Sequence, residues 1–162
     1  MPGKRYSKAA VGILACLLLP LLSITEVHAA DGPAQIVELE LNAPAVPASE
    51  ARFEADSRAL APGISPWTYV EYRTPGEKYR CYVQNFCAVV WDPTRAKWAI
   101  FFLYNCARYD VFYWGGPGRF DDNQTAGTRT YFYDEAEAIA SFAAPWHDIS
   151  YNWDPVYSIE NC

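Results

Sequence analysis

The stretch RFDDNQTAGTR, residues 119–129, concentrates oxygen-bearing side chains within an aromatic-rich chain. Asp121 and Asp122 carry carboxylates, Thr125 carries a hydroxyl, and a tight turn would expose the carbonyl oxygen of Asn123. Ca²⁺ takes about six to eight oxygen ligands of these kinds. The same residue types also form ordinary turns, in which they hydrogen-bond to their own backbone. The residues alone therefore leave two interpretations open, a calcium site and a simple turn.

The chain has few residues that are suited to catalysis. His147 precedes Asp148 in PWHDIS, and a His–Asp pair can orient a base beside a nucleophile. In a strand, however, these two neighbours would point to opposite faces. No G-x-S-x-G or H-E-x-x-H motif is present, and the carboxylates of the acidic stretch 134–137 are not specific to a glycosidase. We therefore predict that the chain is not an enzyme.

The N-terminus has the organisation of a secretory signal peptide. Basic residues at Lys4, Arg5 and Lys8 precede an apolar run over 9–24, and small residues end the segment at Ala29. No later stretch of the sequence is long and apolar enough to cross a membrane. We expect cleavage after residue 29 and a secreted, extracellular protein without a membrane partner.

The charge of the chain excludes one class of partner. The formal net charge is −6, and removal of residues 1–29 leaves 10 basic and 18 acidic side chains. Nucleic-acid binding requires a basic surface that displaces counterions, and this sequence has none. A cation or the basic face of another protein is the more natural partner.

Four cysteines remain after removal of the signal, and three pairings of them are open. An even number in an exported chain favours disulfides over a zinc site, and no histidine lies near these cysteines. We expect one short loop, Cys81–Cys87, and one long loop, Cys106–Cys162. The long loop contributes about 4 kcal/mol in the chain-entropy model.

From Trp67 onward, the sequence predicts short strands separated by turns. WTYVEYR and TRTYFYD alternate between aromatic and polar residues, whereas CAVVW and KWAIFFLYNC are continuous apolar runs. Gly, Pro, Asn and Asp lie between these runs. This pattern is typical of an all-β sandwich or barrel, and we predict a small Greek-key β-sandwich over residues 67–162.

Residues 30–66 differ from the rest in composition. They are rich in Ala, Pro and Glu and contain few large apolar side chains. Ser49 is suited to cap a short helix toward Leu60. We therefore predict a leader or linker over 30–66 that is disordered or weakly helical.

The aromatic residues allow a binding function. A set of them could form a flat platform for sugar rings or fill the core of a small sandwich: Trp91, Trp98, Tyr109, Tyr113, Trp114, Trp146 and Trp153. We single out one binding surface beside the GGPG loop, because binding residues concentrate on loops held by a rigid scaffold. It comprises Tyr113, Trp114, Gly115 and Gly116.

Residues 80–162 resemble the βγ-crystallin-like secreted proteins of actinobacteria, near the small peptidase-inhibitor family. The resemblance lies in CAVVWDPTRAKWAIFFLYNCARYDV and in the turn that follows, Asp121 to Ala126. The family pattern ends this turn in Ser where this chain has Ala126. The second acidic turn, over 153–158, keeps only Asp154 and Ser158, and no glycine occurs in Thr94–Lys97.

The resemblance implies a βγ-crystallin-like fold and a role in binding. It implies Ca²⁺ ligands shared between the two turns, which would add Asp154 and Ser158 to Asp121, Asp122, Asn123 and Thr125. It also implies inhibition of a secreted protease as the function. A cell-wall glycan-binding or antimicrobial module, with wall polysaccharide as partner, and a structural protein stiffened by calcium are the alternatives.

Overall fold

The computed structural model describes residues 39–47 and 60–162, and within these ranges the chain forms twelve β-strands and no helix. The predicted all-β sandwich is confirmed. The predicted signal peptide, residues 1–29, and the predicted helix that begins at Ser49 lie outside the described residues.

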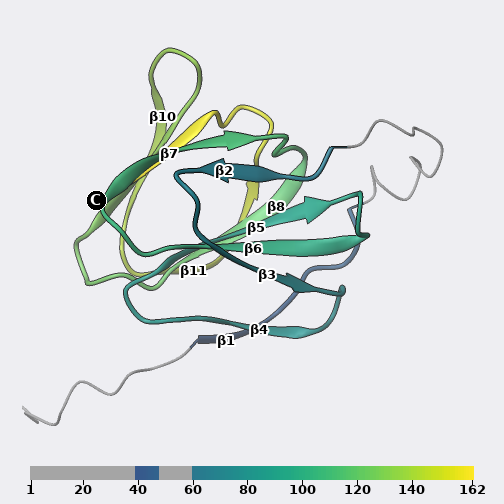
Figure 1. Ribbon diagram of the computed structural model, residues 1–162. Helices are drawn as coiled ribbons and strands as arrows, with labels where there is room; N and C mark the ends of the chain where they lie inside the picture. Colours follow the sequence, from purple (N-terminus) through teal and green to yellow (C-terminus); the bar gives the residue numbers. More distant parts are fainter. Residues whose placement is uncertain (1–38, 48–59) are drawn as a thin grey trace, which may run out of the picture. The chain divides into compact units, whose positions relative to one another are not determined.

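Two five-stranded antiparallel sheets form the sandwich (Figure 1). The outer sheet has the order β10-β9-β12-β7-β2. Its strands are Ala138–Ala143 (β10), Arg129–Tyr133 (β9), Ser158–Asn161 (β12), Ala107–Phe112 (β7) and Gly63–Ser65 (β2). The central sheet has the order β11-β8-β5-β6-β3. Its strands are Trp146–Asn152 (β11), Pro117–Asp122 (β8), Phe86–Asp92 (β5), Lys97–Leu103 (β6) and Tyr69–Arg73 (β3).

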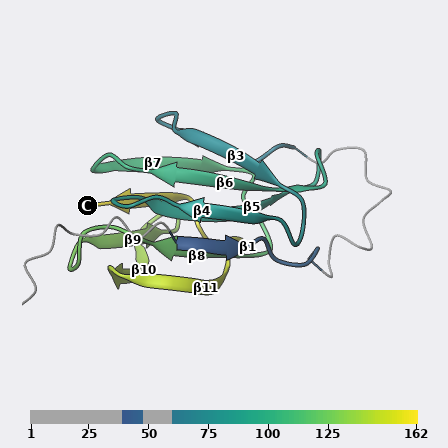
Figure 2. The same cartoon turned by 90° about the horizontal axis from the view of Figure 1, so that it is seen from below.

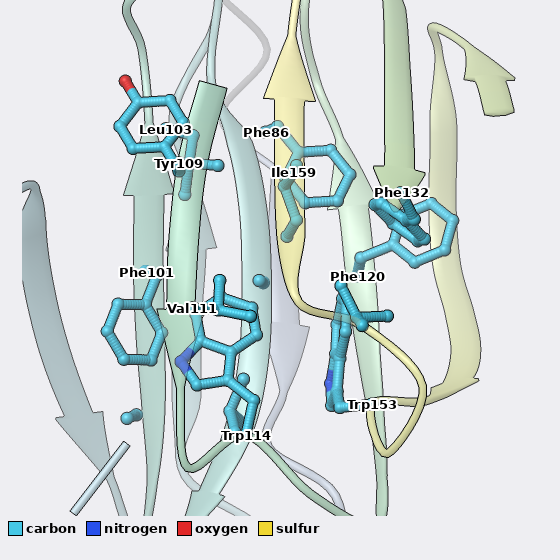
Figure 3. Packing of buried hydrophobic residues seen from close by; sticks show 14 residues of the cluster. Phe86, Phe101, Leu103, Tyr109, Val111, Trp114, Phe120, Phe132, Trp153 and Ile159 are labelled. Carbon is cyan, nitrogen blue, oxygen red and sulfur yellow. The ribbon is translucent and has the colours of Figure 1, made fainter. Parts of the chain in front are cut away.

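The main core lies between these two sheets and is largely aromatic (Figure 3). Phe86 and Phe120 both belong to the central sheet, and their rings stack with the centroids 5.3 Å apart. Phe132 of β9 meets both rings edge-on. The alternating β7 turns Tyr109 and Val111 toward this core and leaves the residues between them exposed. This alternation is the one that the period of a strand requires.

A third, smaller layer covers the other face of the central sheet. Leu39–Asn42 (β1) pairs with Lys78–Cys81 (β4) as an antiparallel ribbon, which lies across the central sheet in Figure 2. A second core cluster forms beneath the ribbon, where Tyr79 and Cys81 pack with Val89, Trp98 and other side chains of β5 and β6. Every residue of β5 is buried as a result. Strands covered on both faces read as continuous apolar runs, which explains the patterns of CAVVW and KWAIFFL.

The ribbon changes the predicted domain boundary. Residues 39–42 and 63–65 fall in the segment that we assigned to a leader, yet they form β1 and β2 within the sheets. Among the described residues, strand pairing therefore begins before the predicted boundary at residue 67. The alternation in LELN is only four residues long, so prolines and alanines nearby masked it in the sequence.

Both expected disulfides are present. Cys81 pairs with Cys87 across a Cα–Cα distance of 5.9 Å, and Cys106 pairs with Cys162 across 4.7 Å. The second bond joins residues 56 positions apart and ties the last residue to the start of β7. Because the bond closes a long loop, it removes much of the freedom of the unfolded state.

Gly118 is required by the close approach of β8, Trp153 and Val89. The Trp153 indole Nε1 donates a hydrogen bond to the Val89 carbonyl at 3.0 Å. A Cβ at position 118 would overlap both of these atoms and lie 2.7 Å from Cδ1 of Trp153. We predict that Gly118→Ala lowers the free energy of unfolding by about 1–3 kcal/mol, as overpacking does, measured by denaturant unfolding.

Gly63→Ala is the matched control for this substitution. Gly63 also lies in a strand, but its added Cβ would meet only Phe112 at the ordinary distance of 3.8 Å. We expect a change within about 0.5 kcal/mol. Equal effects of the two substitutions would contradict the role assigned to Gly118.

Candidate functional site

Asp121 of the predicted calcium turn is a buried structural group at the end of β8. Its Oδ2 accepts a hydrogen bond from the Tyr79 hydroxyl at 2.6 Å, and its Oδ1 accepts one from the Asp148 backbone nitrogen, also at 2.6 Å. These bonds join β8 to the ribbon on one side and to β11 on the other. Burial raises the pKa of Asp121, although both hydrogen bonds act in the opposite direction. Burial and the neighbouring Asp121 likewise raise the pKa of Tyr79.

Asp122 is fully buried on the side of the main core. Its carboxylate accepts long hydrogen bonds from the Gln124 backbone nitrogen, at 3.3 Å, and from the Thr130 hydroxyl, at 3.4 Å. The same hydroxyl lies 3.0 Å from Oε1 of Gln124. Because these weak contacts only partly offset the loss of water, burial raises the pKa of Asp122 to about 6.

The rest of the first turn is shaped by backbone hydrogen bonds. The Asn123 carbonyl, which we expected to face a cation, accepts a bond from the Gln84 backbone nitrogen at 2.8 Å. The Asn123 side-chain amide donates to the Cys81 carbonyl at 2.8 Å. The backbone carbonyl of the exposed Thr125 accepts from Thr128. This arrangement supports the interpretation of the stretch as a turn.

The two predicted calcium turns do not meet. Asp154 accepts a hydrogen bond from the Gly116 backbone nitrogen at 2.6 Å, just before β8 begins, whereas Asp121 and Asp122 end that strand. At about 3.3 Å per residue, the two ends of β8 are roughly 20 Å apart. Ser158 accepts from Arg108 in the outer sheet. The structure therefore does not bring the six predicted ligands together, and no cluster of three or more His, Cys, Asp or Glu occurs in the part of the chain that the structure describes. Calcium at the first turn alone stays a prediction.

The predicted binding surface divides into a buried and an exposed part. Trp114 is only 6% exposed, and its ring lies 4.6 Å from that of Phe101 and 5.3 Å from that of Trp153. Figure 3 shows the Trp114 side chain between these two residues. Its assignment to a surface platform is wrong. Tyr113, in contrast, is 64% exposed, and Gly115 is exposed beside it.

The loop that carries Tyr113 is held on both sides. Trp114 anchors it in the core, Asp154 holds the Gly116 nitrogen, and the Trp153 backbone nitrogen donates to the Gly116 carbonyl at 2.9 Å. Phe112, at the end of β7, is 47% exposed and precedes Tyr113. Loop 112–116 thus presents two adjacent aromatic side chains on a fixed backbone.

Most of the remaining aromatic candidates fill the cores. The buried ones are Trp91, Trp98, Tyr109 and Trp153, and only Trp146 is substantially exposed among the other tryptophans that we considered. The core interpretation is therefore correct for these four residues. His147 is exposed, and Asp148 forms an ion pair with Arg119.

The sequence did not reveal a second group of exposed aromatic side chains. Trp67 is 81% exposed, and Tyr69 and Tyr82 lie on either side of the buried Phe102, at 5.4 and 5.6 Å. Tyr104, 60% exposed, follows β6 directly. The alternation of WTYVEYR places Trp67 and Tyr69 on one face, but it does not say that this face is open.

Comparison of the chain with models of protein families, with curated proteins and with solved structures gives no match. The resemblance to βγ-crystallin-like proteins therefore stays a prediction.

The raised pKa of Asp122 predicts a pH dependence of stability. The pKa is about 6 in the folded state and about 3.9 in an unfolded chain. Burial of the protonated carboxyl therefore stabilises the fold fully below pH 4, and this contribution is lost as the pH rises to about 6. We expect this group to make the wild type about 2 kcal/mol more stable at pH 4.5 than at pH 7.

Asp122→Asn should remove this contribution and stabilise the protein at pH 7 relative to wild type, as measured by urea unfolding at both pH values. Asp134→Asn is the control, because Asp134 lies in an exposed turn and hydrogen bonds from Glu137 and Ala136 lower its pKa. That variant should keep the difference between pH 4.5 and pH 7. If Asp122→Asn also keeps the difference in stability between pH 4.5 and pH 7, Asp122 is not the group that causes it.

Proposed function

We propose that this chain is an exported, non-enzymatic binding protein that inhibits an extracellular peptidase through loop 112–116. The observation that carries the proposal is the pair Phe112 and Tyr113, two exposed aromatic side chains on a loop pinned between the sheets. The sequence resemblance to the small peptidase-inhibitor family points in the same direction.

The geometry of the loop suits tight binding. An inhibitor must occupy a peptidase cleft without losing much conformational freedom, because ordering a mobile loop weakens binding. Here Trp114 is already fixed in the core, and the Gly116 amide and carbonyl are already bonded to Asp154 and Trp153. Tyrosine side chains add large contact areas with few rotatable bonds. Tyr113 is therefore suited to enter a specificity pocket.

Export is supported by one observation besides the N-terminal segment. The two disulfides suit an oxidising compartment. No helix among the described residues is long and apolar enough to span a membrane.

The chemistry of the polar groups supports a role without catalysis. The buried Asp121 is engaged by Tyr79 and by the backbone of β11, and Asp148 is engaged by Arg119. These carboxylates stabilise the arrangement of the strands.

The test is a panel of secreted serine, cysteine and metallopeptidases assayed with the whole exported protein. We expect at least one peptidase to be inhibited at a near-stoichiometric ratio. Tyr113→Ala should weaken that inhibition about 30-fold or more, the effect of losing a side chain worth about 2 kcal/mol at an interface. Tyr157→Ala is the control, because Tyr157 is half-exposed but lies outside the loop. If micromolar protein slows no peptidase, the proposal is wrong.

A second prediction tests the rigidity of the loop. Asp154→Ala removes the hydrogen bond to Gly116 from an exposed position, so the free energy of unfolding should fall by only about 1 kcal/mol. The free energy of binding to the peptidase should fall by more than 1 kcal/mol, mainly through faster dissociation, because the loop must then be ordered on binding. Unchanged dissociation kinetics would show that the hydrogen bond between Asp154 and Gly116 has no role in binding.

A further inference from the structure

A polar hollow of about 340 Å³ lies at the other end of β8 from loop 112–116. Its volume is within the range of about 300–1,000 Å³ that small-molecule sites have. Its walls come from three separate turns, and its lining residues are Gln84, Tyr104, Asn105, Cys106, Gln124, Thr125 and Thr128.

The lining contains no charged side chain. It offers three carboxamides, two hydroxyls and the phenol ring of Tyr104. The nearby carboxylate of Asp122 is fully buried and does not line the hollow. An ion would therefore find no opposite charge here, whereas a neutral ligand with many hydroxyls would find partners that can both donate and accept.

Several of these polar groups remain available to a ligand. Oε1 of Gln84 accepts from the Tyr104 hydroxyl at 3.2 Å, and Oε1 of Gln124 accepts from Thr130 at 3.0 Å. Each of these bonds fixes the amide so that its Nε2 is left as a donor. Among the hydrogen bonds of the described residues, none involves these two nitrogens or the hydroxyls of Thr125 and Thr128.

The walls of the hollow are held in place before any ligand arrives. Cys106 lines it and is bonded to Cys162, and Gln84 lies in the loop closed by Cys81–Cys87. The Gln84 backbone also donates to the Asn123 carbonyl. Preorganised donors of this kind cost little to order when a ligand binds.

Aromatic side chains extend the site beyond the hollow. Tyr104 is 60% exposed, and Tyr82, which is 42% exposed, precedes Gln84 in the loop that the Cys81–Cys87 disulfide closes. Tyr69 lies across Phe102 from Tyr82. Exposed rings with polar tips offer a flat apolar face together with a hydrogen-bonding group. A sugar ring, apolar on its faces and polar at its rim, has the complementary character.

We propose that this hollow and the Tyr104 ring bind a neutral polysaccharide chain, with one sugar ring among the amides and its neighbours against the exposed tyrosines. The site is independent of loop 112–116, since the two lie roughly 20 Å apart along β8.

The test is cosedimentation of the whole exported protein with three insoluble neutral polysaccharides, namely chitin, cellulose and β-1,3-glucan. We expect the protein to pellet with at least one of them, in 50 mM and in 500 mM NaCl alike, because no ion pair is involved. Tyr104→Ala should lower the affinity about tenfold or more, the loss of roughly 1.4 kcal/mol of ring contact. Gln124→Ala should also weaken binding.

Two control variants keep this test separate from peptidase inhibition. Tyr113→Ala should leave polysaccharide binding unchanged, and Tyr104→Ala should leave inhibition unchanged. Thermal unfolding should show that Tyr104→Ala, at an exposed position, keeps the wild-type melting temperature.

The proposal is overturned if the protein pellets with none of the three polymers, or if Tyr104→Ala pellets as well as wild type. Salt-sensitive binding to polygalacturonate alone would show instead that an acidic polymer is the ligand. Capture of unglycosylated peptides on an array, lost in Tyr104→Ala and without any polysaccharide binding, would reassign the hollow to a peptide.

Discussion

The burial of β5 and β6 on both faces is the constraint on which the rest of the structure depends. β5 has no exposed residue, and β6 has only its first, Lys97. One face of this pair requires the outer sheet and the other requires the β1–β4 ribbon, because apolar side chains left in water would each forgo about 1.5–3 kcal/mol. With the middle of the central sheet covered, the aromatic side chains that stay exposed gather where its strands end. Loop 112–116 and the Tyr104 hollow both occupy such positions.

Asp121 shows how this layering turns a polar residue into a structural tie. A carboxylate without water is costly unless donors replace the lost hydration. Here the donors come from the ribbon, through Tyr79, and from β11, through the backbone of Asp148. Charge-assisted bonds of this kind are stronger than neutral ones, so the group holds the third layer against the central sheet. Asp122, one residue later, faces the main core with longer hydrogen bonds, and burial raises its pKa to about 6.

The sequence predicted the features that depend on local patterns. Turn residues and apolar runs identified the strands of the sandwich, and the cysteine count with export predicted the disulfides. It did not predict the ribbon, because LELN is a short alternation among prolines and its partner β4 lies far along the chain.

Nor did the sequence predict which of Tyr113 and Trp114 is exposed. Tyr109 and Val111 face the core, so strict alternation along the strand would bury Tyr113 and expose Trp114. The positive φ of 59° at Tyr113 interrupts this alternation, so Tyr113 is exposed and Trp114 is buried. Such a reversal depends on tertiary packing around Trp153 and Phe101, which no local pattern encodes.

The two proposed surfaces differ in chemistry because the two ends of β8 are supported differently. At its start, a buried tryptophan and one carboxylate hold a glycine-rich loop, which needs small residues to approach Asp154 closely. At its end, two disulfides and a network of amides hold turns whose side chains remain free for hydrogen bonding. Since the strand between them is paired with β5 and β11 on its two edges, occupation of one end need not disturb the other. On the two proposals, the chain would hold a neutral polysaccharide at one end of β8 and a peptidase at the other, and attachment to the polymer would raise the local concentration of the second site.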